Sequence, residues 1–106
     1  MRTAFISDIH ANLDALETVL ADIGRQEADR IVCLGDIVGY GPEPNPCVAR
    51  VREVCKVTVV GNHDYAALGR IDTLGFNEYA RAAAEWTAAA LDKDAIEFLS
   101  GLPLET

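Results

Sequence analysis

The sequence predicts an α/β fold in which a parallel sheet is built as βαβαβ and is followed by helices. Short apolar runs occupy residues 3–7, 30–34 and 57–60, and the second and third are rich in β-branched residues, as is typical of buried parallel strands. The connections between these runs have the composition of helices and a proline-rich loop. Two βαβ units of this kind cross over right-handed almost without exception.

The first connection carries the clearest helix signal. Leucine and isoleucine recur at helical spacing over residues 13–23, which places them on one face of a helix. Asn12 can act as the N-cap, and Gly24 is a residue type at which helices commonly end. The second connection starts with a proline-rich loop over residues 41–46, and a short helix is expected over residues 47–54.

The last third of the chain is predicted to be helical. Asn77 can cap an alanine-rich helix whose small residues allow close packing against a neighbour, and Asp92 can cap a final helix that Gly101 ends.

Length and composition limit the classes of function. The chain has 106 residues, enough for one domain, and half of it is apolar, so it can build a core. Its formal net charge of −8 argues against a nucleic-acid binder, because such proteins neutralise phosphates with basic side chains. Three cysteines without CxxC spacing indicate reduced thiols and a cytoplasmic protein. Apolar stretches are too short for a signal peptide or membrane span, so no membrane partner is expected.

Each predicted strand runs directly into residues that can bind metal ions. The three clusters are Ser7-Asp8-Ile9-His10, Gly35-Asp36 and Gly61-Asn62-His63-Asp64. Ligands bind at the carboxyl ends of strands in open α/β sheets, and these clusters are separated by close to the roughly 30 residues that one βαβ unit needs. We therefore expect the clusters to lie side by side. Their carboxylates, imidazole and amide suit divalent manganese, iron or zinc.

The residue types also indicate how ions would be shared. Asp8 and His10 can reach one ion together, the two oxygens of Asp36 can bridge two ions, and Asn62 offers an oxygen to the second. Taken singly, each residue has a structural alternative, such as a helix cap, a surface histidine or a turn. Because residues of metal-ligand type follow all three strands, in the order that such a site needs, the metal site is favoured over these structural alternatives. A dinucleotide-binding unit fits less well, because no Gly-x-Gly-x-x-Gly follows the first strand.

These motifs resemble the first three motifs of the calcineurin-like metallophosphoesterases. The stretch Gly39-Tyr40-Gly41-Pro42 resembles a bacterial subgroup of single-domain phosphoesterases, and the resemblance covers essentially the whole chain. It implies the βαβαβ half of a four-layer α/β/β/α sandwich. It also implies a metal-dependent phosphoesterase that hydrolyses phosphodiesters or small phosphomonoesters through a metal-bound hydroxide.

The resemblance further implies a division of roles. The metal ligands would be Asp8, His10, Asp36 and Asn62, with Asp36 shared between two ions of manganese, iron or zinc. His63 would contact the phosphate and assist the leaving group, and Asp64 would hold His63 in orientation. The partner would be a small phosphate ester, with nucleic acid entering only as a phosphodiester substrate. Arg70 or Arg81 could reach the substrate phosphate, although helix arginines are usually solvated.

The chain departs from the family in its histidines. Family members are longer, and the histidines that complete their metal site lie in their second half, whereas this chain has only His10 and His63. We therefore expect residues 1–106 to be the N-terminal part of the domain, with the C-terminal half absent, and to hold one ion loosely. The alternative is a catalytically incomplete domain that acts as a metal-binding or interaction module. An apolar sheet face left open could be buried in a homodimer.

Overall fold

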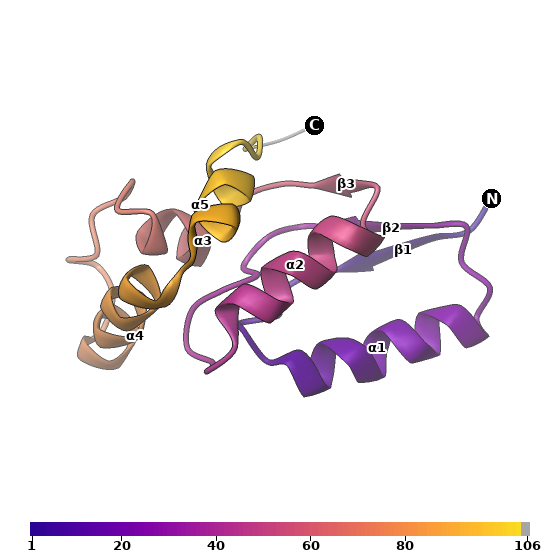
Figure 1. The fold of residues 1–106 in the computed structure, drawn as a ribbon, viewed down its shortest axis with the longest axis horizontal. Coiled ribbons are helices and arrows are strands. Elements are labelled where there is room, and N and C mark those ends of the chain that lie inside the picture. Colours follow the sequence, from indigo (N-terminus) through magenta and orange to yellow (C-terminus); the bar gives the residue numbers. More distant parts are fainter. Residues whose placement is uncertain (105–106) are drawn as a thin grey trace.

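The computed structural model describes residues 1–104 and has the predicted α/β architecture (Figure 1). The strands are β1 (Thr3–Ile6), β2 (Arg30–Cys33) and β3 (Val57–Thr58). The helices are α1 (Leu13–Arg25), α2 (Pro44–Val54), α3 (Asn62–Ala67), α4 (Glu78–Ala90) and α5 (Lys93–Ser100). The sheet is parallel with the order β1-β2-β3, so the chain forms the two successive βαβ units that the sequence predicts.

Helices α1 and α2 lie on the same side of the sheet (Figure 1). Both crossovers run between neighbouring strands in the same direction, and right-handed crossovers then place both helices on one face. The core fills this layer, with Leu16 of α1 and Val51 of α2 packed in one cluster with Cys33 of β2. Phe5 on β1 and Leu34, which directly follows β2, remain 65% and 50% exposed, so part of the surface at the sheet is uncovered and apolar.

The start of α1 agrees with the sequence, and its end does not. The Asn12 side chain accepts a hydrogen bond from the Ala15 amide at 3.0 Å, as expected of an N-cap. The predicted stop at Gly24 is wrong, because α1 continues through Arg25 and is capped by Gln26. The left-handed residue that turns the chain away is Glu27, with a φ of 57°.

Helix α2 begins earlier than the sequence analysis expected. It starts at Pro44 rather than at residue 47, because the first turn of a helix does not need the backbone N–H groups that proline lacks. The side chain of Asn45 in this turn donates to the Ala90 carbonyl at 2.9 Å and accepts from the Asp92 amide at 2.8 Å. These bonds fix the junction between α4 and α5 against α2.

The two C-terminal helices have the predicted caps. The side chains of Asn77 and Asp92 each accept a backbone hydrogen bond at 2.8 Å, and Gly101 is the C-cap of α5. Leu99 of α5 is fully buried in the common core. After α5 the chain returns to the sheet region, where the Val60 amide donates to the Pro103 carbonyl at 2.9 Å.

Within residues 1–104, no helix has both the length and the apolar character needed to cross a membrane.

Candidate metal centre

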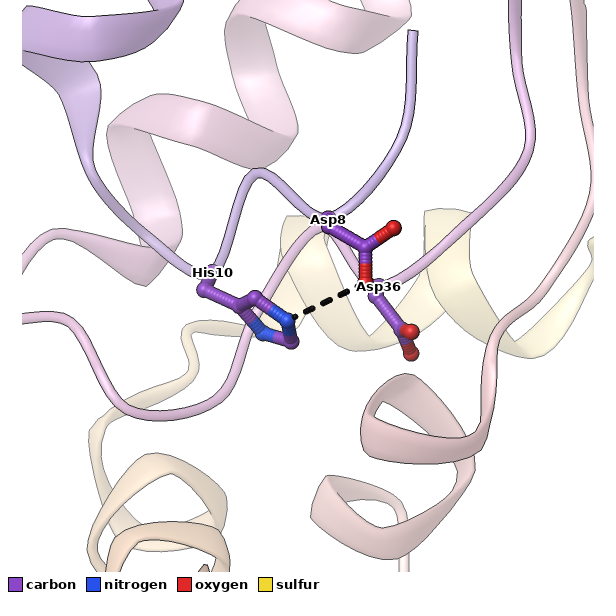
Figure 2. Close-up of side chains that lie close together, drawn as sticks. All are labelled: Asp8, His10 and Asp36. Carbon is purple, nitrogen blue, oxygen red and sulfur yellow. Dashed lines mark ion pairs between the residues drawn. The ribbon is translucent and has the colours of Figure 1, made fainter.

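The loops that follow β1 and β2 bring two carboxylates and an imidazole together. Asp8, His10 and Asp36 each offer one ligand atom, and these atoms all lie within 4.8 Å of one another (Figure 2). Two carboxylate oxygens and an imidazole nitrogen form a donor set that suits manganese, iron or zinc. The structure therefore unites three of the four residues proposed from the sequence as metal ligands.

The backbone in these loops is held in an unusual conformation. Asp8, His10 and Asp36 have φ angles of 55°, 50° and 55°, in the left-handed region that non-glycine residues seldom adopt. Each such residue costs of order 1–2 kcal/mol. The Asp8 amide donates to the Gly35 carbonyl at 3.2 Å, and the His10 amide donates to the Asp36 carbonyl at 3.0 Å. The two loops therefore hold each other in the conformation that directs the ligands inward.

Glycines allow the loops to approach closely. A Cβ atom added to Gly35 would lie 2.5 Å from the Gly61 nitrogen, and one added to Gly61 would collide with the Asp36 amide and carboxylate. At Gly41 an added Cβ would collide with the His10 carbonyl. Side chains at these positions are excluded by backbone atoms that cannot easily move.

The surroundings of His10 favour a cation at its Nε2 atom. The Nδ1 atom lies 3.3 Å from the Val38 carbonyl oxygen, so the neutral ring is assigned as donating from Nδ1. The Nε2 lone pair then faces Asp8 Oδ1 at a distance of 3.4 Å, as Figure 2 shows. Two lone pairs this close repel each other unless a proton or a metal ion lies between them. The ligand set therefore fits a divalent ion.

Asp8 is held in its ionised form. The Ser7 hydroxyl donates to Asp8 Oδ2 at 2.8 Å and lowers the pKa of the carboxyl. An ionised carboxylate is the form that binds a metal ion.

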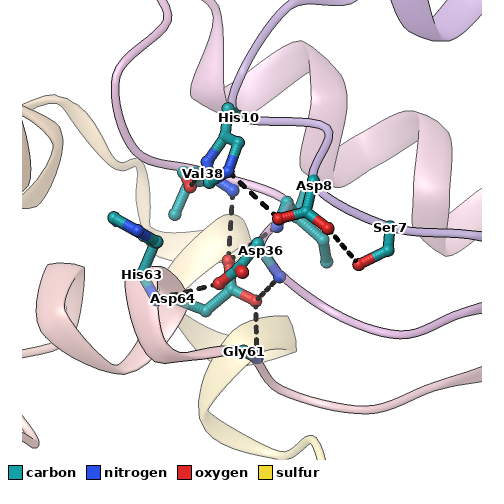
Figure 3. A network of polar contacts seen from close by, with 9 residues as sticks. Ser7, Asp8, His10, Asp36, Val38, Gly61, His63 and Asp64 are labelled. Carbon is teal, nitrogen blue, oxygen red and sulfur yellow. Dashed lines mark hydrogen bonds and ion pairs between the residues drawn. The ribbon is translucent and has the colours of Figure 1, made fainter.

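Asp64 has a different set of partners from the one expected. Its carboxylate is fully buried and accepts four backbone hydrogen bonds, shown in Figure 3. The donors are the amides of Asp36 (3.0 Å), Ile37 (2.9 Å), Val38 (3.1 Å) and Gly61 (3.0 Å). Burial raises the pKa of this carboxyl to about 6, although most of these amides act in the opposite direction. The sequence analysis expected the His63 ring as the partner, whereas in residues 1–104 the carboxylate fixes the loop that carries Asp36.

His63 and Asn62 begin α3 beside this loop. The His63 amide donates to Asp36 Oδ1 at 3.0 Å, so α3 also helps to orient the Asp36 carboxylate. The His63 ring lies 4.9 Å from the His10 ring, centroid to centroid, which places a second imidazole next to the metal ligands. Asn62 is exposed at the first position of α3.

Two aromatic rings lie against the histidines, and a third stacks on one of them. Tyr40 lies 5.2 Å from His10 and 5.0 Å from His63, and Phe76 lies 5.2 Å from His63. Tyr79 of α4 stacks on Tyr40 at 5.6 Å. The sequence analysis missed Phe76 and Tyr79, because neither lies near the end of a strand and no spacing rule connects them to the ligands.

A cavity of about 440 Å³ opens beside Asp8 and His10. It lies between the N-terminal half of α1 and the loop of Tyr40, and apolar side chains such as Leu16 and Val19 line its far wall. Arg70, considered above as a phosphate ligand, instead directs its guanidinium to the Ser100 carbonyl at 3.3 Å.

Comparison with known proteins shows what the whole chain is similar to. The family model for calcineurin-like phosphoesterases matches residues 1–106. An uncharacterized protein of Methanocaldococcus jannaschii is 48% identical over 101 residues, which are 95% of this chain and 42% of that protein.

Two solved structures are also similar. A metallophosphoesterase from Sphaerobacter thermophilus has a TM-score of 0.80 and 50% identity, covering 97% of this chain and 42% of that one. A putative diadenosine tetraphosphatase has a TM-score of 0.74 and 28% identity, covering 96% of this chain and 43% of that one. The chain thus spans about two fifths of the length of these relatives.

Proposed function

This chain belongs to the calcineurin-like phosphoesterases, and on that premise we propose that it forms part of a metal centre that hydrolyses phosphodiesters or small phosphomonoesters. The observation that carries the proposal is the convergence of ligand atoms from Asp8, His10 and Asp36 within 4.8 Å. A divalent ion held there would lower the pKa of a water molecule and neutralise charge on the phosphate.

Each residue has a proposed task. Asp8 and His10 would hold the first ion, Asp36 would be shared with a second, and Asn62 would offer an oxygen to that second ion. The interaction of His10 Nδ1 with the Val38 carbonyl at 3.3 Å supports its role, because that contact leaves Nε2 free to bind.

His63 is proposed to contact the substrate phosphate and to help protonate the leaving group. Its ring lies beside the metal ligands, 4.9 Å from the His10 ring, and its amide is fixed by Asp36 Oδ1. For Asp64 we propose a role as a positioning residue, because its four hydrogen bonds go to the backbone that carries Asp36 and to Gly61.

Residues 1–106 are proposed to be the N-terminal part of a metallophosphoesterase domain. The remaining ligands would then come from outside these residues, or from a second copy in a homodimer that covers the exposed Phe5 and Leu34. The free thiols of Cys33, Cys47 and Cys55 fit a cytoplasmic protein. Because one similar structure is described as a putative diadenosine tetraphosphatase, dinucleotide polyphosphates belong among the substrates to be tested.

Hydrolysis of bis-p-nitrophenyl phosphate tests this proposal. The chain would be assayed with and without manganese, beside Asp36→Asn and a control, Asp22→Asn, that makes the same chemical change at an exposed position on α1. We expect manganese-dependent turnover that is lost in Asp36→Asn and kept in Asp22→Asn. Absence of turnover in the folded protein would instead favour the alternative of a metal-binding or interaction module.

A further inference from the structure

A row of aromatic rings leads from the metal ligands to the protein surface. It starts at His10, whose ring is 5.2 Å from that of Tyr40 in an edge-on arrangement. Tyr79 then stacks on Tyr40, with centroids 5.6 Å apart and planes inclined by 18°. The row joins the loop after β2 to the first turn of α4. A group attached to a phosphate at the metal ligands would meet these rings as it extends toward solvent.

The two tyrosines are exposed to an extent that packing alone does not explain. Tyr79 is 70% exposed and Tyr40 is 40% exposed. Helix α4 already packs through its own buried face, which consists of Ala80, Ala84 and Thr87. Tyr79 therefore adds little to the attachment of α4.

The backbone conformation of Tyr40 also indicates that its ring is placed for a purpose other than packing. Its φ of 67° is in the left-handed region, which is costly for a bulky aromatic residue. Strained residues of this kind gather at sites of function, because the surrounding structure must hold them in place. Here the strain places the Tyr40 ring between His10 and Tyr79. No hydrogen bond of either tyrosine hydroxyl is seen within residues 1–104.

We propose that Tyr79, backed by Tyr40, offers the exposed face of its ring as a stacking surface for a planar group of nucleobase type on the phosphate ester that the site hydrolyses. This inference rests on the proposed function for the phosphate, but the stacking itself does not need a metal ion. Every nucleobase offers a flat face, and stacking on an aromatic side chain needs no charge. That suits a chain with a net charge of −8, which repels anionic ligands unless a metal ion is bound.

The test measures binding of adenosine, with ribose as the control ligand, by NMR titration of the metal-free chain. The variants are Tyr79→Ala, Tyr79→Leu and Tyr79→Phe. Tyr79 is exposed on a helix and alanine favours helices, so the first variant should fold. We expect adenosine to shift resonances of Tyr40 and Tyr79, and ribose to shift neither. Affinity should fall about 5- to 150-fold in Tyr79→Ala, fall similarly in Tyr79→Leu, and be kept in Tyr79→Phe.

Equal binding of adenosine by the wild type and Tyr79→Ala would overturn the inference, as would adenosine shifts no larger than those of ribose. A parallel titration with manganese reports on the metal centre separately. If manganese does not bind while adenosine still requires the Tyr79 ring, the proposed function fails and the stacking surface stands. If manganese binds and adenosine does not, the inference fails and the metal centre stands.

Discussion

Replacement of Asp64 by asparagine should destabilise the loop that carries Asp36. In the structure, Oδ1 accepts from the amides of Ile37 and Val38, and Oδ2 accepts from those of Asp36 and Gly61. Asparagine has nearly the same shape, but its NH₂ group would face two N–H donors and could accept from neither. Two charge-assisted hydrogen bonds would be lost, at roughly 1.5–3 kcal/mol each. Asparagine also removes the cost of burying a charge, which raises the pKa of Asp64 to about 6, so we expect a smaller net fall in the free energy of unfolding, of about 1–3 kcal/mol.

Urea denaturation at pH 7.5, followed by circular dichroism, measures this change for Asp64→Asn. The control is Asp22→Asn on the surface of α1, whose ion pair with Arg25 is exposed and should contribute less than about 1 kcal/mol. Manganese affinity should also fall in Asp64→Asn, because Asp64 fixes the amide of Asp36 itself. A loss of less than 1 kcal/mol together with unchanged manganese affinity would refute the role of Asp64 as the residue that positions this loop.

Three further changes test other parts of the structure. Gly61→Ala should lower the free energy of unfolding by about 1–3 kcal/mol in urea denaturation and weaken manganese binding, because the added Cβ would collide with the Asp36 carboxylate. The control Gly75→Ala, where the added Cβ meets open space, should change the stability little. Asp92→Ala removes the N-cap of α5 and should cost about 1 kcal/mol in the same assay, and no change would show that the cap is dispensable. Burial raises the pKa of the Cys47 thiol to about 11 from 9.0, so the thiol ionises at a lower pH in the unfolded chain than in the folded one. The stability that the neutral thiol contributes is therefore complete below pH 9 and is lost as the pH rises toward 11. The wild type should therefore lose about 3 kcal/mol more than Cys47→Ala between pH 8.5 and 11.5, and parallel profiles would contradict this.

The convergence of the metal ligands could be predicted from the sequence because topology determines it. Parallel strands end at the same edge of the sheet, so Asp8, His10 and Asp36 had to meet once the βαβ order was recognised. The caps at Asn12, Asn77 and Asp92 were predictable for a similar reason, since a cap depends on local hydrogen bonds alone.

Features that depend on contacts between loops could not be predicted. Three of the four partners of Asp64 are backbone amides of the loop in which Asp36 adopts a left-handed conformation, and no sequence pattern signals that conformation for an aspartate. Tyr79 reaches Tyr40 through the packing of α3 against α4, which residue spacing does not encode. The end of α1 was misplaced because a single glycine costs a helix only about 1 kcal/mol, and the last turn of α1 tolerates Gly24.

Manganese binding, followed by electron paramagnetic resonance, tests the central claim most directly. The free Mn²⁺ signal would be titrated with the wild type, Asp8→Asn, Asp36→Asn and the surface control Asp22→Asn. The account predicts that the wild type and Asp22→Asn deplete the free signal alike, and that Asp8→Asn and Asp36→Asn each bind at least tenfold more weakly. Equal depletion by all four proteins would contradict it, because the ion would then be held elsewhere than at the ends of β1 and β2.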